Sequence, residues 1–410
     1  MTTPPDDGPL STADALARAD ALVADGRPAD ARALLAAVAR ADDATSDAPA
    51  YLVLAAIART HVVEGDAVAA LHELDAALDA ARAAADRAGV AYVRNATAGT
   101  LLRLGRIADA ERAYADAHRE AEAAGDLHTA AKVSANLGVV CGIRGELRAA
   151  LAHLDAALAA FRRLGLAHDV AYAINNRALA LQRLERLEEA AAAYAEALHM
   201  LEALGDPHGR AMLHVNRGEL AVRRGRLDEA RVECDAADAL GRQMGDDRVL
   251  GLAHKLAGVI ARERGDLAGA ESELRAAEAL AEPREDLLLL AEALSERADL
   301  HKRQGRNRDV FQCLNRAHRL FGQLRARRDV ADVDQRMRAL EDEFLRVARR
   351  WGDAIEAKDR FTQGHCERVA ELACAIAARA GAEAGFDDAT LFWFRIGALL
   401  HDVGKLIVPA

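Results

Sequence analysis

The stretch GDLHTAAKVSANLGVVCGIRGELRAALAHLDAALAAFRRLG, from Gly125 to Gly165, decides the fold. Its glycines at 125, 145 and 165 are spaced by 20 residues, and both intervals are rich in alanine and leucine at helical spacing. Glycine adopts the left-handed conformation that ends a helix without a clash of a Cβ atom. The stretch therefore predicts two helices of roughly 16–18 residues joined by tight turns.

The same pattern extends in both directions along the chain. A turn residue recurs in steps of 39 or 40 residues, at Gly26, Gly65, Gly105, Gly145, Glu185, Gly225, Gly265 and Gly305. A small residue follows five positions later in every period except the last, at Ala31, Ala70, Ala110, Ala150, Ala190, Ala230 and Ala270, with Val310 as the exception. A small residue lets the second helix approach the first, so we predict eight stacked helical hairpins in an all-α solenoid.

This pattern resembles the tetratricopeptide repeat (TPR) in its 40-residue form, over about residues 11–321. The family's small residue seven positions before the turn is present as Ala98, Gly138, Ala178, Gly218, Gly258 and Ala298. The resemblance implies a right-handed superhelix whose concave groove binds a peptide or another protein. Residues 1–10 are expected to be a disordered N-terminus.

Asn136, Asn176 and Asn216 recur at one position of three successive first helices. In TPR proteins this position often faces the groove, where an asparagine can hydrogen-bond the backbone of a ligand. The alternative is a hydrogen bond between neighbouring helices that holds the stack together. The sequence does not decide between the two.

A different spacing begins in the connecting segment, residues 322–358, where we predict one long helix from about Val330 to Lys358. Its apolar residues alternate in steps of three and four, at Val330, Val333, Met337, Leu340, Phe344, Val347, Trp351 and Ala354. This heptad spacing predicts a parallel homodimer along residues 330–355, in which Arg336 and Glu341 attract each other. The alternative is a single amphipathic helix that caps the last repeat.

Residues 359–410 carry the chemistry. We predict one helix from Thr362 to Ala380 and a second from about Ala389 to Gly404, joined by a short loop and therefore antiparallel. This arrangement brings His365 beside His401 and Asp402, a mixed nitrogen and oxygen set suited to Mn²⁺, Fe²⁺ or Zn²⁺. The alternative is a pair of buried core histidines with a charge at a helix end.

The motifs Thr362-Gln-Gly-His-Cys-Glu-Arg-Val369 and His401-Asp-Val-Gly-Lys405 resemble the start of an HD-GYP domain. This is the bacterial branch of the metal-dependent HD phosphohydrolases, which degrades cyclic-di-GMP. The resemblance implies that His365, His401 and Asp402 are metal ligands, and that Asp402 and Lys405 take part in catalysis. The family's later histidines and its GYP segment do not occur before Ala410, so we expect a truncated domain that does not turn over substrate.

Taken together, the sequence predicts a cytoplasmic signalling protein with a TPR sensor and an HD-GYP phosphodiesterase output that acts on a cyclic dinucleotide. Two alternatives remain: a TPR adaptor with a vestigial HD segment, and an HD nucleotide phosphohydrolase of another group. The net charge of −11 is spread without a basic stripe, which argues against DNA as a partner. No apolar run approaches ~20 residues, so no membrane segment is expected. The five cysteines show no CxxC spacing and are expected to be reduced thiols.

Overall fold

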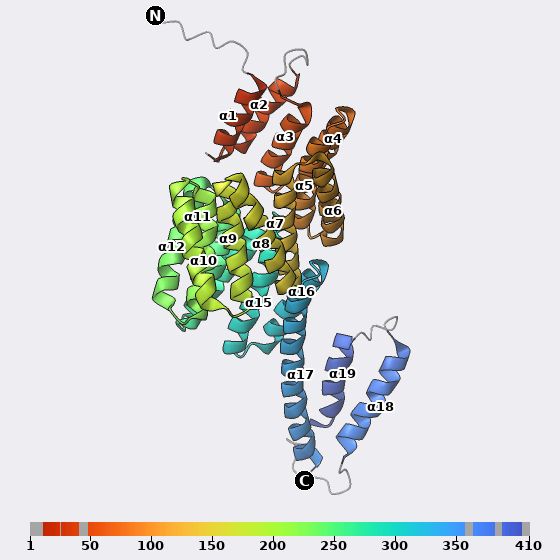
Figure 1. The fold of residues 1–410 in the computed structure, drawn as a ribbon. Helices are drawn as coiled ribbons and strands as arrows, with labels where there is room; N and C mark the ends of the chain where they lie inside the picture. Colours follow the sequence, from red (N-terminus) through yellow and green to blue (C-terminus); the bar gives the residue numbers. More distant parts are fainter. Residues whose placement is uncertain (1–10, 25, 41–47, 357–363, 382–387, 404–410) are drawn as a thin grey trace, which may run out of the picture. The chain divides into compact units, whose positions relative to one another are not determined.

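The structure is a computed structural model that describes residues 11–24, 26–40, 48–356, 364–381 and 388–403. Within these ranges the chain forms nineteen α-helices and no strand, which confirms the predicted all-α class (Figure 1). None of the described helices is both long and apolar enough to cross a membrane. The chain divides into two compact units, residues 1–330 and 331–410, and each is described by itself. The predicted disordered N-terminus, residues 1–10, lies outside the described residues.

The first unit is built from helical hairpins in which each helix packs against the next. The described part contains eight such hairpins, as the repeat spacing predicted: α1 (Thr12–Ala24) with α2 (Pro28–Arg40), α3 (Ala50–Glu64) with α4 (Ala67–Ala83), α5 (Arg87–Arg103) with α6 (Ile107–Ala124), α7 (Leu127–Arg144) with α8 (Leu147–Leu164), α9 (Ala167–Arg183) with α10 (Leu187–Ala203), α11 (Pro207–Arg223) with α12 (Leu227–Met244), α13 (Asp247–Glu263) with α14 (Leu267–Ala281), and α15 (Leu287–Arg303) with α16 (Asn307–Gln323).

Apart from residues 41–47, which lie outside the described residues, the turns within and between hairpins adopt the left-handed conformation that the glycine spacing predicted. Gly145, for example, has φ 81°, and the N–H groups of Gly145 and Glu146 close the end of α7 on the carbonyls of Gly142 and Cys141. Glu185 takes the same conformation with φ 61°, so the interrupted glycine series does not interrupt the fold. The turns between hairpins that lack glycine behave likewise, with positive φ at Ala85, Glu285 and Arg325.

Small residues allow the close packing of the two helices in each hairpin. The alanines five positions after the turn are completely buried, with 0% exposure from Ala31 to Ala270. A Cβ atom added to Gly138 would lie 2.7 Å from Cγ of Leu154 and 3.2 Å from the carbonyl oxygen of Ala150. The second helix therefore approaches so closely that this position of the first helix has little room for a side chain.

The second unit contains most of α17 (Arg327–Glu356) together with α18 (His365–Ala380) and α19 (Asp388–Leu399). Helices α18 and α19 pack side by side (Figure 1). Ala348 of α17, Ala370 of α18 and Leu399 of α19 form a small buried core between the three helices. The short loop predicted between the last two helices thus joins a packed pair.

Helix α18 begins at His365 and not at Thr362, which corrects the predicted start. Gly364 occupies the N-cap with φ 71°, a left-handed conformation that cannot continue the helix backwards. Thr362 itself lies outside the described residues, and so does Lys358, the predicted end of the connecting helix. Helix α17 is otherwise the long helix that the heptad spacing predicted, with 30 residues.

The apolar stripe of α17 that is predicted to form the dimer is partly buried within the chain and partly exposed. Leu340 is buried, and the Phe344 ring packs edge-on against Trp393 of α19 with 5.5 Å between ring centroids. Val347 and Trp351 remain exposed, Trp351 to 52%. Part of the apolar stripe is therefore used within the chain, and dimerisation along residues 330–355 stays a prediction.

Candidate metal centre

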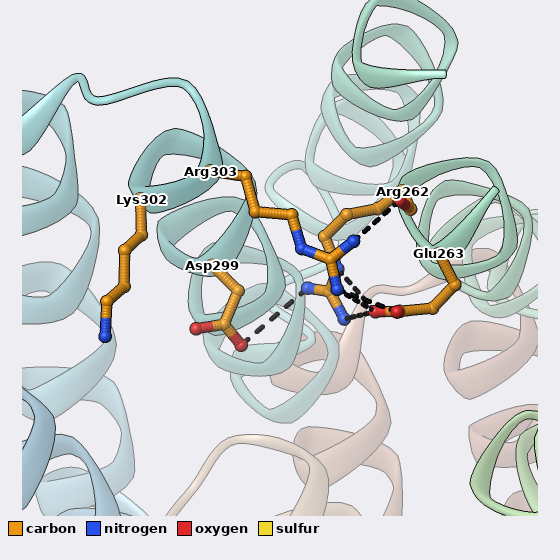
Figure 2. A pocket seen from close by; sticks show the side chains of 5 residues that line it. All are labelled: Arg262, Glu263, Asp299, Lys302 and Arg303. Atoms are coloured by element: carbon orange, nitrogen blue, oxygen red, sulfur yellow. Dashed lines mark hydrogen bonds and ion pairs between the residues drawn. The ribbon is translucent and has the colours of Figure 1, made fainter. Parts of the chain in front are cut away.

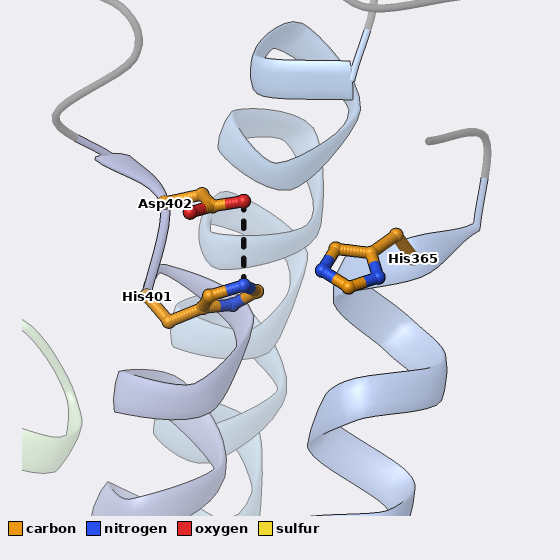
Figure 3. A group of neighbouring side chains, drawn as sticks. All are labelled: His365, His401 and Asp402. Carbon is orange, nitrogen blue, oxygen red and sulfur yellow. Dashed lines mark ion pairs between the residues drawn. The ribbon is translucent and has the colours of Figure 1, made fainter. Parts of the chain in front are cut away.

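His365, His401 and Asp402 converge at one end of the helix pair. His365 is the first residue of α18, whereas His401 and Asp402 directly follow the last turn of α19. The two imidazole rings lie 5.2 Å apart between centroids, and one potential ligand atom of each of the three residues lies within 4.8 Å of the others. Figure 3 shows the three side chains pointing toward a common space. One small ion could contact all three.

The backbone fixes which nitrogen of His401 faces this space. Its Nδ1 atom lies 2.8 Å from the carbonyl oxygen of Ala398. A carbonyl oxygen can only accept, so Nδ1 carries the proton and the neutral ring presents a lone pair at Nε2. Metal-binding histidines are commonly oriented in this way by a hydrogen bond from the other ring nitrogen.

The electrostatics of the pair also favour a cation. Nε2 of His401 lies 3.3 Å from Oδ2 of Asp402. A lone pair and a carboxylate that face each other at this distance repel, unless a proton or a positive ion lies between them. Two imidazole nitrogens and one carboxylate oxygen suit a divalent ion of the Mn²⁺, Fe²⁺ or Zn²⁺ class. The three predicted ligands therefore fit a metal, and their chemistry does not select one of these ions.

Glu367 lies two residues after His365 and connects all three helices of the unit. Its Oε1 atom accepts from Arg395 of α19 at 3.1 Å and from Arg349 of α17 at 3.3 Å. The sequence does not predict this network, because the three residues have no common spacing and lie on three separate helices. Lys405, the predicted phosphate contact, and Gly404 lie outside the described residues.

Asn136, Asn176 and Asn216 lie where the sequence placed them, on successive first helices. Asn136 donates to Asn95 of the preceding first helix at 2.9 Å, and Asn216 donates to Asn175 in the same way at 2.9 Å. Asn176 is half-buried. The structure thus contains the inter-helix hydrogen bond at two of the three positions, while a ligand role for the asparagines stays a prediction.

A hollow of about 440 Å³ lies between the C-terminal ends of α13 and α15. Figure 2 shows its lining: Arg262, Glu263, Asp299, Lys302 and Arg303. The Arg303 guanidinium donates to the carbonyl oxygen of Arg262 at 2.9 Å and to Glu263 at 2.7 Å, so these charges largely satisfy one another. The hollow is lined by charged side chains.

Comparison with known proteins finds likenesses to the C-terminal segment and to the helical fold of this chain. Residues 362–410 match the HD domain family. A 3'3'-cGAMP-specific phosphodiesterase 3 of Vibrio cholerae is 40% identical over 68 residues, which are 16% of this chain. The matched segment spans only 14% of that relative's length. The C-terminal segment of the chain is therefore similar to HD domains.

Solved structures resemble the fold of the array. A Rap protein complexed with competence and sporulation factor has a TM-score of 0.58 and 13% identity, with 76% of this chain and 98% of that chain covered. A Rap conjugation gene regulator in complex with a Phr peptide has a TM-score of 0.56 and 13% identity, with 78% and 95% covered. These likenesses confirm the TPR-like helical solenoid.

Proposed function

We propose that the chain is a cytoplasmic signalling protein in which a TPR array binds a peptide or protein and an HD-GYP segment supplies the metal site of a cyclic-dinucleotide phosphodiesterase. The observation that carries the proposal is the convergence of His365, His401 and Asp402 in the segment that matches the HD domain family. These residues come from two helices and are separated by 36 positions, so their meeting depends on the fold of the segment.

The residues of the site have distinct roles in this proposal. His365 and His401 bind through imidazole nitrogens, and Asp402 binds through a carboxylate that can also bridge two ions. A bound divalent ion would stabilise negative charge on a phosphoryl oxygen and activate a water molecule. Ala398 holds the His401 ring by accepting its Nδ1 proton, which keeps Nε2 directed at the site. Lys405 would contribute a positive charge for a phosphate oxygen.

The substrate class follows from the motifs and from the relative. The HD-GYP resemblance favours cyclic-di-GMP, and the Vibrio relative is by its name specific for 3'3'-cGAMP. Both molecules are cyclic dinucleotides with two phosphodiester bonds, so the shared chemistry is the hydrolysis of one such bond. We propose cyclic dinucleotides as the substrate class, and hydrolysis assays with both molecules determine which bases are preferred.

In this proposal the array is the part of the chain that binds the signalling ligand. The Rap conjugation gene regulator named above is in complex with a Phr peptide, and both Rap structures resemble the solenoid fold of this chain. We propose that this array likewise binds a peptide or an extended protein segment in its groove.

The test separates metal binding from catalysis. Isothermal titration of the chain with Mn²⁺ should show binding that is lost in Asp402→Ala and kept in Glu371→Gln, an exposed acidic residue of α18. Hydrolysis of cyclic-di-GMP and 3'3'-cGAMP is then measured with Mn²⁺ and with Fe²⁺, in this chain and in any longer product encoded by DNA beyond codon 410. Absence of metal binding in the unmodified chain would refute the proposed site. Metal binding without hydrolysis in every product would favour the adaptor alternative.

A further inference from the structure

The array touches itself across a large distance in sequence. Four turn glycines of the first hairpins lie against residues near the end of the unit. A Cβ atom added to each would approach the following atoms: at Gly26, the carbonyl oxygen of Met244 at 2.9 Å; at Gly65, Cγ of Arg284 at 3.5 Å; at Gly105, Cδ1 of Leu287 at 2.6 Å; and at Gly145, Cβ of Arg328 at 2.8 Å. We call these four contacts the inter-turn seam, because successive turns of the superhelix meet there.

The same position is open in the later hairpins. Gly225, Gly265 and Gly305 have equally positive φ values of 72°, 86° and 70°, but a Cβ atom added there would meet nothing within 4 Å. The contacts are therefore not a general property of the repeat. They arise because the superhelix returns far enough to bring hairpins one to four against the segment from 244 to 328.

Two arginines stabilise the inter-turn seam by hydrogen bonds to carbonyl oxygens at the ends of two helices. Arg284 donates to the carbonyl oxygen of Val63 at 2.6 Å, across 221 residues, and Arg328 donates to that of Arg183 at 2.7 Å, across 145 residues. Both carbonyls belong to the last turn of a helix, α3 and α9, beyond which no helical N–H is available. The negative end of the helix dipole makes a guanidinium a favourable partner there.

A third long-range polar contact involves Arg183, the residue whose carbonyl oxygen accepts from Arg328. Arg183 and Glu292, which belong to α9 and α15, approach to 3.9 Å. Arg328 is the second residue of α17, so its hydrogen bond anchors the start of the connecting helix to the end of α9. The start of α17 is thereby tied to a hairpin in the middle of the array.

We propose that the inter-turn seam is a releasable closure of the array. The array has a closed form, in which Arg284 and Arg328 occupy the two helix ends, and an open form, in which these hydrogen bonds are broken and the first turn of α17 is released. A ligand that binds the two forms unequally shifts their populations and so changes the state of α17. This inference concerns the array and the start of α17, and it does not depend on the proposed phosphodiesterase chemistry.

Matched glycine substitutions test the closure. Gly105 and Gly225 have φ values of 68° and 72°, and asparagine tolerates this region better than other residues with a side chain, so the local strain is equal in Gly105→Asn and Gly225→Asn. Only the first substitution places a side chain in the seam. We expect Gly105→Asn to increase the radius of gyration measured by small-angle X-ray scattering and to speed hydrogen exchange in residues 327–335. Gly225→Asn should leave both unchanged, and equal behaviour of the two variants would refute the closure.

Removal of the arginines gives an independent test that leaves the turns intact. The double variant Arg284→Ala/Arg328→Ala should show the same larger radius of gyration and the same faster hydrogen exchange in residues 327–335 as Gly105→Asn. Arg112→Ala is the control, because Arg112 pairs with its neighbour Asp109 on the same helix. If circular dichroism shows that Gly105→Asn does not fold, the comparison of the double arginine variant with Arg112→Ala tests the closure by itself. A double variant with the parent's radius of gyration and exchange rates would overturn the proposal.

A cross-link tests the closed form directly. A Cβ atom at Gly65 would lie 3.6 Å from Cβ of Arg284, within the range of a disulfide. Gly65→Cys/Arg284→Cys should therefore form a disulfide under mild oxidation, found by mass spectrometry of the digested chain, and should slow exchange in residues 327–335. Arg284→Cys alone should not cross-link to residue 65. Failure of the pair to cross-link in the folded chain would contradict the closed form.

Discussion

Nε2 of His401 faces Oδ2 of Asp402 at 3.3 Å, while Nδ1 of the same ring is held by the carbonyl oxygen of Ala398. The fold thus directs the electron pair of the imidazole toward a negative charge. Such an arrangement is stabilised by whatever positive species lies between the two atoms. The thermal stability of the second unit should accordingly depend on divalent ions.

The first prediction is that Mn²⁺ raises the melting temperature of the parent chain and not that of His401→Ala. A ligand that binds only the folded form stabilises it by about 2.7 kcal/mol at a concentration one hundred times its dissociation constant. Differential scanning fluorimetry with and without Mn²⁺ measures the shift. His318→Ala, in the array, should respond like the parent. An equal shift in His401→Ala would place the bound ion elsewhere.

The second prediction concerns Glu367, which joins α17, α18 and α19. Glu367→Gln should lower the stability of the second unit by no more than about 1 kcal/mol, because the side chains in the network are a third to a half exposed. It should also weaken Mn²⁺ binding, since Glu367 positions the helix that begins with His365. If Mn²⁺ affinity is unchanged while stability falls, the network is structural only.

The third prediction tests helix packing with two glycines of α7. Gly138→Ala should destabilise the array by about 1–3 kcal/mol, since the new methyl group would collide with Leu154 and Ala150. Gly142→Ala should instead be neutral or stabilise by about 0.5–1 kcal/mol, since nothing lies within 4 Å of its added Cβ atom and alanine favours a helix. Urea unfolding measures both. A similar loss in the two variants would mean that the packing argument is wrong.

The fourth prediction concerns acid. Burial alone would raise the pKa of Asp246, but hydrogen bonds from His208 and from the N–H groups of Val249 and Arg248 outweigh it and lower the pKa from 3.8 to about 2. Because the folded pKa lies below the unfolded value, the carboxylate stabilises the fold above pH 3.8. This contribution is lost as the pH falls toward 2.

Asp246→Asn should therefore be less stable than the parent at pH 6, by about 2 kcal/mol. The difference should shrink between pH 4 and pH 2, where the parent carboxylate becomes protonated. Urea unfolding at several pH values gives the two curves. Asp235→Asn serves as the control, because this exposed residue pairs with Arg231 on the same helix. A difference that stays constant with pH would contradict the assignment.

The fifth prediction concerns the dimer along α17. Phe344 packs against Trp393 within the chain, so its substitution would disturb the second unit directly. Trp351 is 52% exposed and belongs to the same heptad positions, which makes Trp351→Glu the better test. Light scattering should show a dimeric parent at tens of micromolar and a monomeric variant, as one would expect from removing a large apolar contact. A monomeric parent would exclude the dimer at that concentration.

Features that depend on residues close together in the sequence, such as turns and short loops, could be predicted from the sequence. The helix ends of the array follow from glycine spacing, because the backbone requires φ > 0 at a turn. Glu185 and Ala85 adopt the same turn without glycine, so there the register of the neighbouring repeats, and not the residue itself, determines the conformation. His365 and His401 could be paired because a short loop implies an antiparallel hairpin.

Long-range contacts without a repeating pattern were missed. The hydrogen bond from Arg284 to Val63 joins residues 221 positions apart, and nothing in either residue type marks the partner. The curvature of the superhelix accumulates from small rotations at each hairpin, and these rotations are set by packing details that a periodic pattern does not contain. The start of α18 was misplaced for a related reason, since Gly364 and not the better N-cap residue Thr362 precedes the helix.

The inter-turn seam has a consequence for how such a chain can evolve. Arrays of repeats usually lengthen or shorten by duplication or loss of single modules, because each module contacts only its neighbours. Here, gain or loss of one 40-residue module between Val63 and Arg284 would bring a different side chain opposite the end of α3 and leave its last carbonyls without their partner. The number of hairpins between Val63 and Arg284 is therefore constrained as a whole, and homologues that retain Arg284 for this contact should retain that number.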